Sequence, residues 1–288
     1  MLWQKGRRSD NVEDAGGGGG GPSFGGGRGL GIGGIIILAI LGAVFYKDPT
    51  ALLGQGDPGA AAPSQSQPRP AADANDPQVD FVRAILGETE DTWGEIFAAN
   101  GQRYEQPKLV LFHGAVRTAC GSASSAVGPF YCPGDRKVYL DLDFFQEMQR
   151  RFHESGDFAR AYVIAHEVGH HVQNLVGIFD KAAEARRRGA SMEGATGLSV
   201  RQELQADCFA GVWANHSQQR QHWLQPGDIE SALNAATAIG DDALQEQAQG
   251  RVVPDSFTHG TSAQRVRWFK TGFEGGDIGK CNTFSGSI

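Results

Sequence analysis

Two histidines stand four residues apart in His166-Glu167-Val168-Gly169-His170, within an apolar stretch from 161 to 176. Residues four apart lie on one face of a helix, so a helix here places both imidazoles where they can bind one tetrahedral zinc ion. A helix that is apolar over most of its circumference is buried, and buried histidines without partners are costly. Because a metal ion removes that cost, the pattern predicts a buried helix with His166 and His170 as metal ligands. A surface helix with two incidental histidines is the disfavoured alternative.

Glu167 follows the first histidine directly and therefore points about 100° further around the helix. That direction excludes it as a third ligand on the same face. It suits a general base that takes a proton from a zinc-activated water, so Glu167 is predicted to be catalytic.

The third ligand is expected from a second helical stretch, 201–213, in which Glu203 and Asp207 lie one turn apart. Glu203 would complete the set with His166 and His170. Asp207 would accept the other ring N–H of a ligand histidine, expected to be His166, and fix its tautomer. An ordinary solvated acidic face is disfavoured, because the neighbouring side chains are small and apolar.

The motifs H-E-x-x-H and E-x-x-A-D together resemble the gluzincin group of zinc peptidases, in which one helix brings the histidines and a facing helix the glutamate. The chain is more similar to the bacterial "putative neutral zinc metallopeptidase" family, whose members carry an N-terminal membrane segment. The segments that carry this resemblance lie between about residues 78 and 285, at 128–133, 166–173, 203–214 and 259–269. Gln173 and Val176 exclude the metzincin group, which has Gly and His at these positions.

The periodic segments predict a helix-dominated α+β fold with a small sheet, and the resemblance implies that it is a zincin-like metallopeptidase domain. The resemblance also implies Zn²⁺ as cofactor and a peptide or protein as substrate. A non-hydrolytic, zinc-containing binding or scaffold protein of the cell envelope is the alternative from a different class.

Peptide hydrolysis needs a donor for the oxyanion, and His259 and Arg265 are the candidates. His259 lies in a loop just before a helix expected at 262–273, which Thr261 and Gln264 begin as a capping box. Three alternatives remain open: a loop histidine without a role, an ion pair of Arg265 with Asp207 or Glu203, and a tyrosine donor, either Tyr139 or Tyr162.

The first 77 residues differ in composition from the rest. Residues 1–29, with six consecutive glycines, predict a flexible cytoplasmic tail, and the uncharged apolar residues 30–46 predict one transmembrane helix. Residues 47–77, rich in Pro, Ala and Gln, predict a linker to a domain at 78–288. Lys and Arg before the apolar segment place the N-terminus in the cytoplasm. We therefore expect a single-pass protein of the bacterial cell membrane, attached by its N-terminal helix, with an extracytoplasmic (periplasmic or extracellular) domain; a cleaved signal peptide is the alternative.

All four cysteines fall within 78–288, and an even number in an oxidising compartment suggests disulfides. Of the three possible pairings we favour Cys120 with Cys132, which closes a short loop, and Cys208 with Cys281, which ties the tail to the Glu203 helix. The net charge of −7, without a long basic stretch, gives no support for nucleic-acid binding.

Periodicity predicts the remaining elements. Further helices are expected at 82–97, 143–151, 157–176 and 228–239, and strands at 108–112 and 137–142. By analogy with zincin folds, the strand around Val138 is expected to bind an extended peptide by edge pairing.

Overall fold

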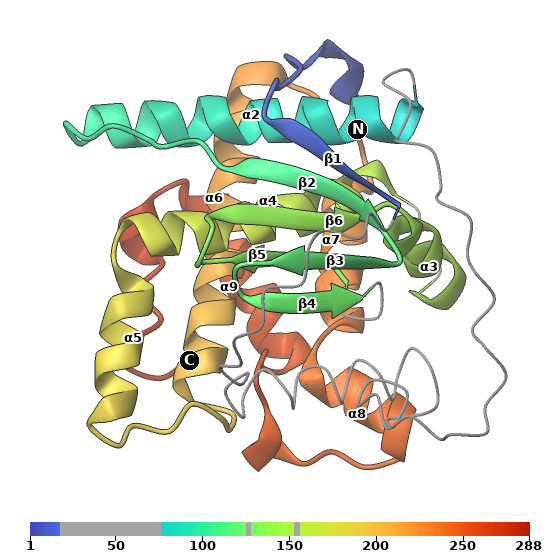
Figure 1. The fold of residues 1–288 in the computed structure, drawn as a ribbon. Coiled ribbons are helices and arrows are strands. Elements are labelled where there is room, and N and C mark those ends of the chain that lie inside the picture. The colour runs from blue at the N-terminus through green and yellow to red at the C-terminus, as the bar shows by residue number, and fades with distance from the viewer. Residues whose placement is uncertain (18–75, 125–127, 153–155) are drawn as a thin grey trace, which may run out of the picture.

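The structure is a computed structural model that describes residues 1–17, 76–124, 128–152 and 156–288 (Figure 1). In these residues helices predominate over a small sheet, as expected for the helix-dominated α+β class. The long helix α2 (Pro77–Ala99) begins at Asp76, whose carboxylate accepts a hydrogen bond from the backbone N–H of Gln78. Pro77 occupies the first turn, where its missing N–H costs nothing.

Four strands form the main sheet, in the order β1 (Val12–Gly17), β2 (Lys108–His113), β6 (Lys137–Asp141), β5 (Phe130–Cys132). The first three are parallel, and β5 is antiparallel to β6. Side chains alternate between the two faces of a strand. Leu109 and Leu111 of β2 therefore enter the main core, whereas Val110 and Phe112 join a smaller cluster on the other face. A separate hairpin of β3 (Ala115–Thr118) and β4 (Gly121–Ser124) adds Val116 to that smaller cluster.

The helices after the sheet carry the polar residues of interest. They are α3 (Asp143–Phe152), α4 (Asp157–Leu175), α5 (Ile178–Arg187), α6 (Leu198–Gln221), α7 (Asp228–Ala238), α8 (Asp241–Gln249) and α9 (Ser262–Gly275). Short 3-10 turns lie at Trp3–Lys5, Pro254–Ser256 and Ile278–Lys280. Helix α4 is almost enclosed, because α2, α6, α7 and the sheet all pack against it. It ends just before Gly177, whose φ of 76° is a conformation that favours glycine.

The predicted periodic elements coincide with observed ones to within a few residues. The segments at 157–176, 108–112 and 137–142 correspond to α4, β2 and β6. The expected capping box is also present, since Thr261 and Gln264 bond each other's backbone N–H groups at the start of α9.

The prediction that the strand around Val138 binds a peptide at a free edge is wrong. This strand is β6, and both of its edges are occupied, by β2 and by β5. Within the described residues β5 has a single partner strand, so β5 provides the edge on this side of the sheet.

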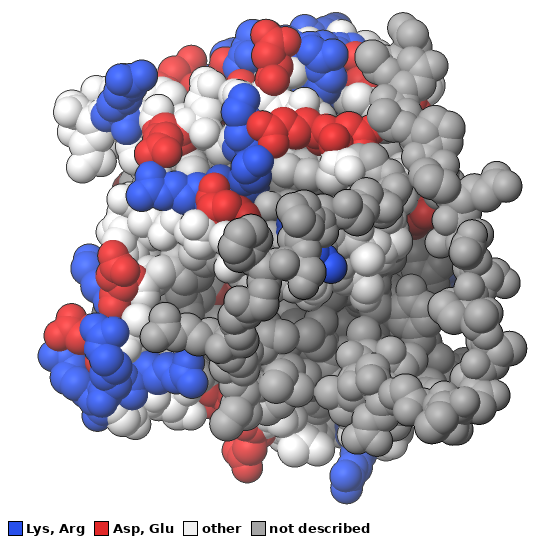
Figure 2. Space-filling model, viewed as in Figure 1, with Lys and Arg blue, Asp and Glu red and all other residues white. Residues whose placement is uncertain are grey.

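The N-terminal residues 1–17 belong to the folded domain, not to a flexible tail. Strand β1 pairs with β2, with Val12 opposite Leu109. Arg7 and Arg8 form ion pairs with Glu90 and Asp80 of α2. Figure 2 shows acidic and basic side chains side by side on this face of the molecule. The sequence interpretation counted these arginines as charges that set a membrane orientation, whereas the structure uses them to hold the N-terminal segment on α2.

This pairing also corrects the expected topology. A single membrane crossing between residues 17 and 76 would put β1 and β2 on opposite sides, yet the two strands share one sheet. The prediction of a single-pass membrane protein with a cytoplasmic N-terminus and an extracytoplasmic domain is therefore wrong. No helix in the described part of the chain is long and apolar enough to cross a membrane. The predicted transmembrane segment 30–46, and the linker up to residue 75, lie outside the described residues.

Both expected disulfides are present. Cys120 and Cys132 join the β3–β4 turn to β5, with their Cα atoms 5.8 Å apart. Cys208 of α6 is bonded to Cys281, across a Cα distance of 5.6 Å. The second bond fixes the segment after α9 against the helix that carries Glu203.

Candidate metal centre

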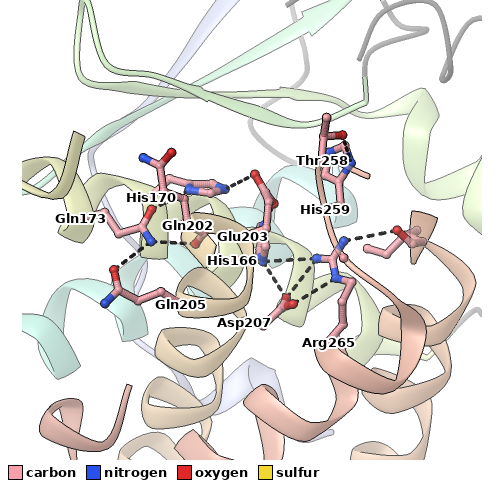
Figure 3. Close-up of polar contacts among 12 residues, drawn as sticks. His166, His170, Gln173, Gln202, Glu203, Gln205, Asp207, Thr258, His259 and Arg265 are labelled. Carbon is pink, nitrogen blue, oxygen red and sulfur yellow. Dashed lines mark hydrogen bonds and ion pairs between the residues drawn. The ribbon is translucent and has the colours of Figure 1, made fainter. Parts of the chain in front are cut away.

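Helices α4 and α6 bring two histidines and a glutamate together (Figure 3). Nε2 of His166 lies 3.1 Å from one carboxylate oxygen of Glu203, and Nε2 of His170 lies 3.4 Å from the other. The ligand atoms of the three residues all fall within 4.8 Å of one another. The helices approach this closely because Gly169 faces Ala206, where a Cβ would lie only 3.0 Å from the Ala206 carbonyl oxygen.

Asp207 contacts His166 on the side of the ring away from Glu203. Its Nδ1 lies 2.8 Å from Oδ1 of Asp207, which is fully buried, so Nε2 is left to face Glu203. The expected contact between Asp207 and His166 is thus in the structure. Tyr162 also donates a hydrogen bond of 2.5 Å to the same carboxylate oxygen.

The neighbouring carboxylates favour the protonated, positively charged form of His166. Although burial favours the neutral imidazole, the charge and hydrogen bond of Asp207, and then the hydrogen bond to Glu203, raise the pKa of His166 to about 10. Burial alone would raise the pKa of Glu203, but the charge of His170 and the hydrogen bonds from both histidines hold it well below its usual range. Two imidazoles and one carboxylate are a donor set of catalytic zinc sites, so the residues present fit a zinc ion.

Glu167 lines the same cavity from the neighbouring face of α4. Its residue is only 8% exposed, and burial raises the pKa of its carboxyl group above the usual value. A carboxylate with a raised pKa is a better proton acceptor.

The cavity over the histidines has a volume of about 300 Å³. Apolar side chains form much of its wall, among them Phe130, Phe144, Phe179, Ile239 and Leu244. Tyr131, like Phe130 a residue of β5, also lines it, so the edge strand of the sheet runs beside the candidate metal centre.

His259 lines the cavity opposite the histidine helix, and Asp241 fixes its loop. One oxygen of Asp241 accepts hydrogen bonds from the backbone N–H groups of Thr258, His259 and Gly260, at 2.7, 2.6 and 3.0 Å. The other lies 3.1 Å from Nδ1 of His259. Burial alone would lower the pKa of His259, but the hydrogen bond that it donates to Asp241 and then the charge of Glu203 raise it.

Arg265 forms a buried ion pair with Asp207. Its Nε and Nη2 donate to the two carboxylate oxygens of Asp207, each at 3.0 Å, and Nη1 donates to the carbonyl of Ile239 at 3.3 Å. The guanidinium thus stands behind His166, where it supports Asp207, and the ion-pair alternative describes it better than the oxyanion role predicted for it. The two tyrosine candidates are also engaged elsewhere, Tyr162 with Asp207 and Tyr139 with Asp135.

Two residues of the site were missed from the sequence. Asp241 lies 18 residues before His259, and no motif spacing relates them. Gln173 accepts a hydrogen bond of 2.9 Å from Nδ1 of His170. The spacing of three residues on one helix was a signal for this second contact, because such residues are neighbours on the helix surface.

A family model described as "Putative neutral zinc metallopeptidase" matches residues 1–284. The "Uncharacterized protein YpfJ" of Escherichia coli (strain K12) is 53% identical over 292 residues, covering 100% of both chains. The "Uncharacterized protein Mb2605" of Mycobacterium bovis is 46% identical over 230 residues, which are 76% of this chain and 75% of that protein. No solved structure matches the chain. With a family match over nearly its whole length and the donor set of a zinc centre at its heart, the chain belongs to the putative neutral zinc metallopeptidase family.

Proposed function

We propose that the protein hydrolyses peptide bonds with a zinc ion held by His166, His170 and Glu203. The observation that carries this proposal is the convergence of the two Nε2 atoms on the Glu203 carboxylate beside a cavity that Glu167 also lines. When bound, zinc acts as a Lewis acid toward a water molecule and the substrate carbonyl.

Glu167 supplies the base. It takes a proton from the attacking water, whose oxygen bonds to the carbonyl carbon, and returns that proton to the leaving nitrogen as the C–N bond breaks. Its raised pKa and position in the cavity support this role.

His259 supplies the donor for the developing oxyanion. Because Asp241 occupies Nδ1, the remaining Nε2 is available to the cavity, and the raised pKa keeps the imidazole protonated nearer to neutral pH. Arg265 acts through Asp207 and His166.

Strand β5 offers a place for the peptide main chain. Because β5 lines the cavity, an extended peptide that reaches the candidate metal centre would run beside this strand. The apolar wall then faces the side chains next to the bond that is cut.

The Glu167→Gln substitution tests the proposal. The full-length variant should retain about one zinc per chain by elemental analysis, because Glu167 is not a ligand, and should lose at least 100-fold in hydrolysis of a peptide library (about 10²–10⁴-fold is typical of a general base). Hydrolysis at the wild-type rate would remove Glu167 from the mechanism. A wild-type protein that binds zinc, cleaves nothing and retains a partner regardless of Glu167 would instead support the scaffold alternative.

A further inference from the structure

A buried chain of amide groups lies behind His170 (Figure 3). Gln173 accepts the hydrogen bond from Nδ1 of His170 and donates through Nε2 to the Gln202 carbonyl at 2.7 Å and to Oε1 of Gln205 at 3.0 Å. Gln205 in turn donates through Nε2 to the carbonyl of Cys281 at 2.9 Å. Gln173 is 0% exposed and Gln205 6%, so water does not compete for these bonds.

Two backbone carbonyls fix the direction of the whole chain. A carbonyl oxygen can only accept, so the amide nitrogens of Gln173 and Gln205 must face Gln202 and Cys281. The oxygen of Gln173 is then left to face His170. Nδ1 of His170 must therefore carry a proton, and once Nε2 gives up the proton that it shares with Glu203 in the metal-free protein, the Nε2 lone pair is free for a metal ion.

We infer that Gln173, backed by Gln205, is a positioning residue that fixes His170 in the Nδ1–H tautomer and so prepares Nε2 to bind the metal. This inference rests on the zinc centre of the proposed function and adds residues that the motifs do not assign. The disulfide of Cys208 with Cys281 secures the far end of the chain, because it fixes the carbonyl that orients Gln205.

The two ligand histidines are thus oriented by groups of different charge. His166 faces the carboxylate of Asp207, whose charge Arg265 offsets, whereas His170 faces a neutral amide. A carboxylate behind His170 would add another negative charge to a buried site where, among the described residues, Arg265 stands against Glu167, Glu203 and Asp207. An amide gives the same hydrogen bond without that charge.

Substitution of Gln173 tests the inference in the full-length protein. Gln173→Met keeps the length of the side chain but removes the strong acceptor, and should weaken zinc binding about 10–100-fold, measured by competition with a chromophoric chelator. In the metal-free protein, at an alkaline pH where the His170 ring is neutral, ¹⁵N NMR of labelled histidine should show the proton on Nδ1 alone in the wild type and a tautomer mixture in the variant. Gln173→Glu should restore zinc affinity, because a protonated carboxyl group accepts from His170 and donates to the Gln202 carbonyl.

Gln245→Met is the matched control. Gln245 is also buried, but its amide bonds Ser256 and Val253, so the variant should lose stability without losing zinc affinity. Wild-type zinc affinity in Gln173→Met, or equal losses in both methionine variants, would overturn the inference. If the wild type binds no zinc, the proposed function fails, and the NMR measurement decides the inference alone: a neutral His170 ring that still carries its proton only on Nδ1 in Gln173→Met overturns it.

Discussion

Asp241 shows how one buried carboxylate can organise a functional loop. It is 1% exposed, and its carboxylate accepts hydrogen bonds from three backbone N–H groups and one imidazole of the segment 258–260. Burial alone would raise its pKa, but the hydrogen bond and charge of His259, together with the backbone hydrogen bonds, lower it. The residue that gives His259 its orientation is therefore also a titrating group whose state affects the stability of the loop.

Because Asp241 pairs with His259, the free energy of unfolding should fall both when the pH is lowered and when it is raised. The lowered pKa of Asp241 contributes stability above the usual value of 3.8, and that contribution is lost as the pH falls through the folded-state pKa. The raised pKa of His259 contributes stability below the usual value of 6.5, and that contribution is lost as the pH rises through the folded-state pKa. Asp241→Asn should therefore cost most between these values, by about 1–3 kcal/mol for a hydrogen bond to a charged group.

Urea unfolding of the wild type and of Asp241→Asn measures this effect at three pH values. One is well below pH 3.8, one lies between pH 3.8 and 6.5, and one is well above pH 6.5. The difference in free energy of unfolding should be largest at the middle one. An equal difference at all three would show that the carboxylate charge is irrelevant to the loop.

At the level of elements, α6 and α9 touch through glycines. A methyl group at Gly272 would overlap the carbonyl of Cys208, and one at Gly211 would overlap the backbone of Phe269. This contact places Cys208, which follows Asp207 in α6, directly against α9, the helix that carries Arg265. The close approach of the two helices therefore supports the buried ion pair between them.

Two glycine substitutions with opposite expected signs test the packing. Gly272→Ala should lower the free energy of unfolding by about 1–3 kcal/mol, as overpacking does. Gly94→Ala, in α2 where a Cβ meets nothing within 4 Å, should raise it by about 0.5–1 kcal/mol through helix propensity. Chemical denaturation of both variants is the measurement, and a stabilising Gly272→Ala would mean that the helices lie further apart.

The elements that could be predicted are those with a strong local period. Helix α4 and strand β2 have clear apolar patterns, whereas β1 has the sequence Val-Glu-Asp-Ala-Gly-Gly and pairs only because β2 is beside it. The three-residue β5 gives too short a pattern to predict, and the analogy with zincin folds placed the peptide on the strand around Val138, which is β6. Strand order is set by contacts far apart in the sequence, which a local period does not contain.

The contrast between local spacing and contacts distant in the sequence also applies to the candidate site. The pairing of His166 with His170, and of Glu203 with Asp207, follows from spacing on single helices. Contacts between distant segments, such as that of Asp241 with His259, have no such spacing. Arg265 was identified as important, but its partner depended on how α9 packs on α6.

For the whole molecule, the N-terminal segment is a structural part of the domain. Ser9 is fully buried and donates a 2.6 Å hydrogen bond to Glu90 of α2, while it accepts one from the backbone of Asn11. Asn11 donates to the same carboxylate oxygen at 2.7 Å. Glu90 is only 2% exposed, so its charge relies on these N-terminal partners and on Arg7.

Ser9→Ala should accordingly lower the free energy of unfolding by about 1–3 kcal/mol, because it leaves a buried carboxylate short of a donor. Lys5→Ala, in the same segment but exposed, should change it by less than about 0.5 kcal/mol. Thermal and urea unfolding of the two variants measure this. Equal stability of Ser9→Ala and the wild type would indicate that residues 1–17 do not pack as described.

The union of β1 with β2 has a consequence for biosynthesis. The hydrogen bond from Lys108 to Asn11 beside these strands spans 97 residues, so the first strand to leave the ribosome has no partner until much later. At roughly 5–20 residues per second, that wait lasts on the order of 5–20 s. During this interval β1 lacks the strand with which it pairs in the folded domain, and Arg7 and Arg8 lack the carboxylates of Glu90 and Asp80.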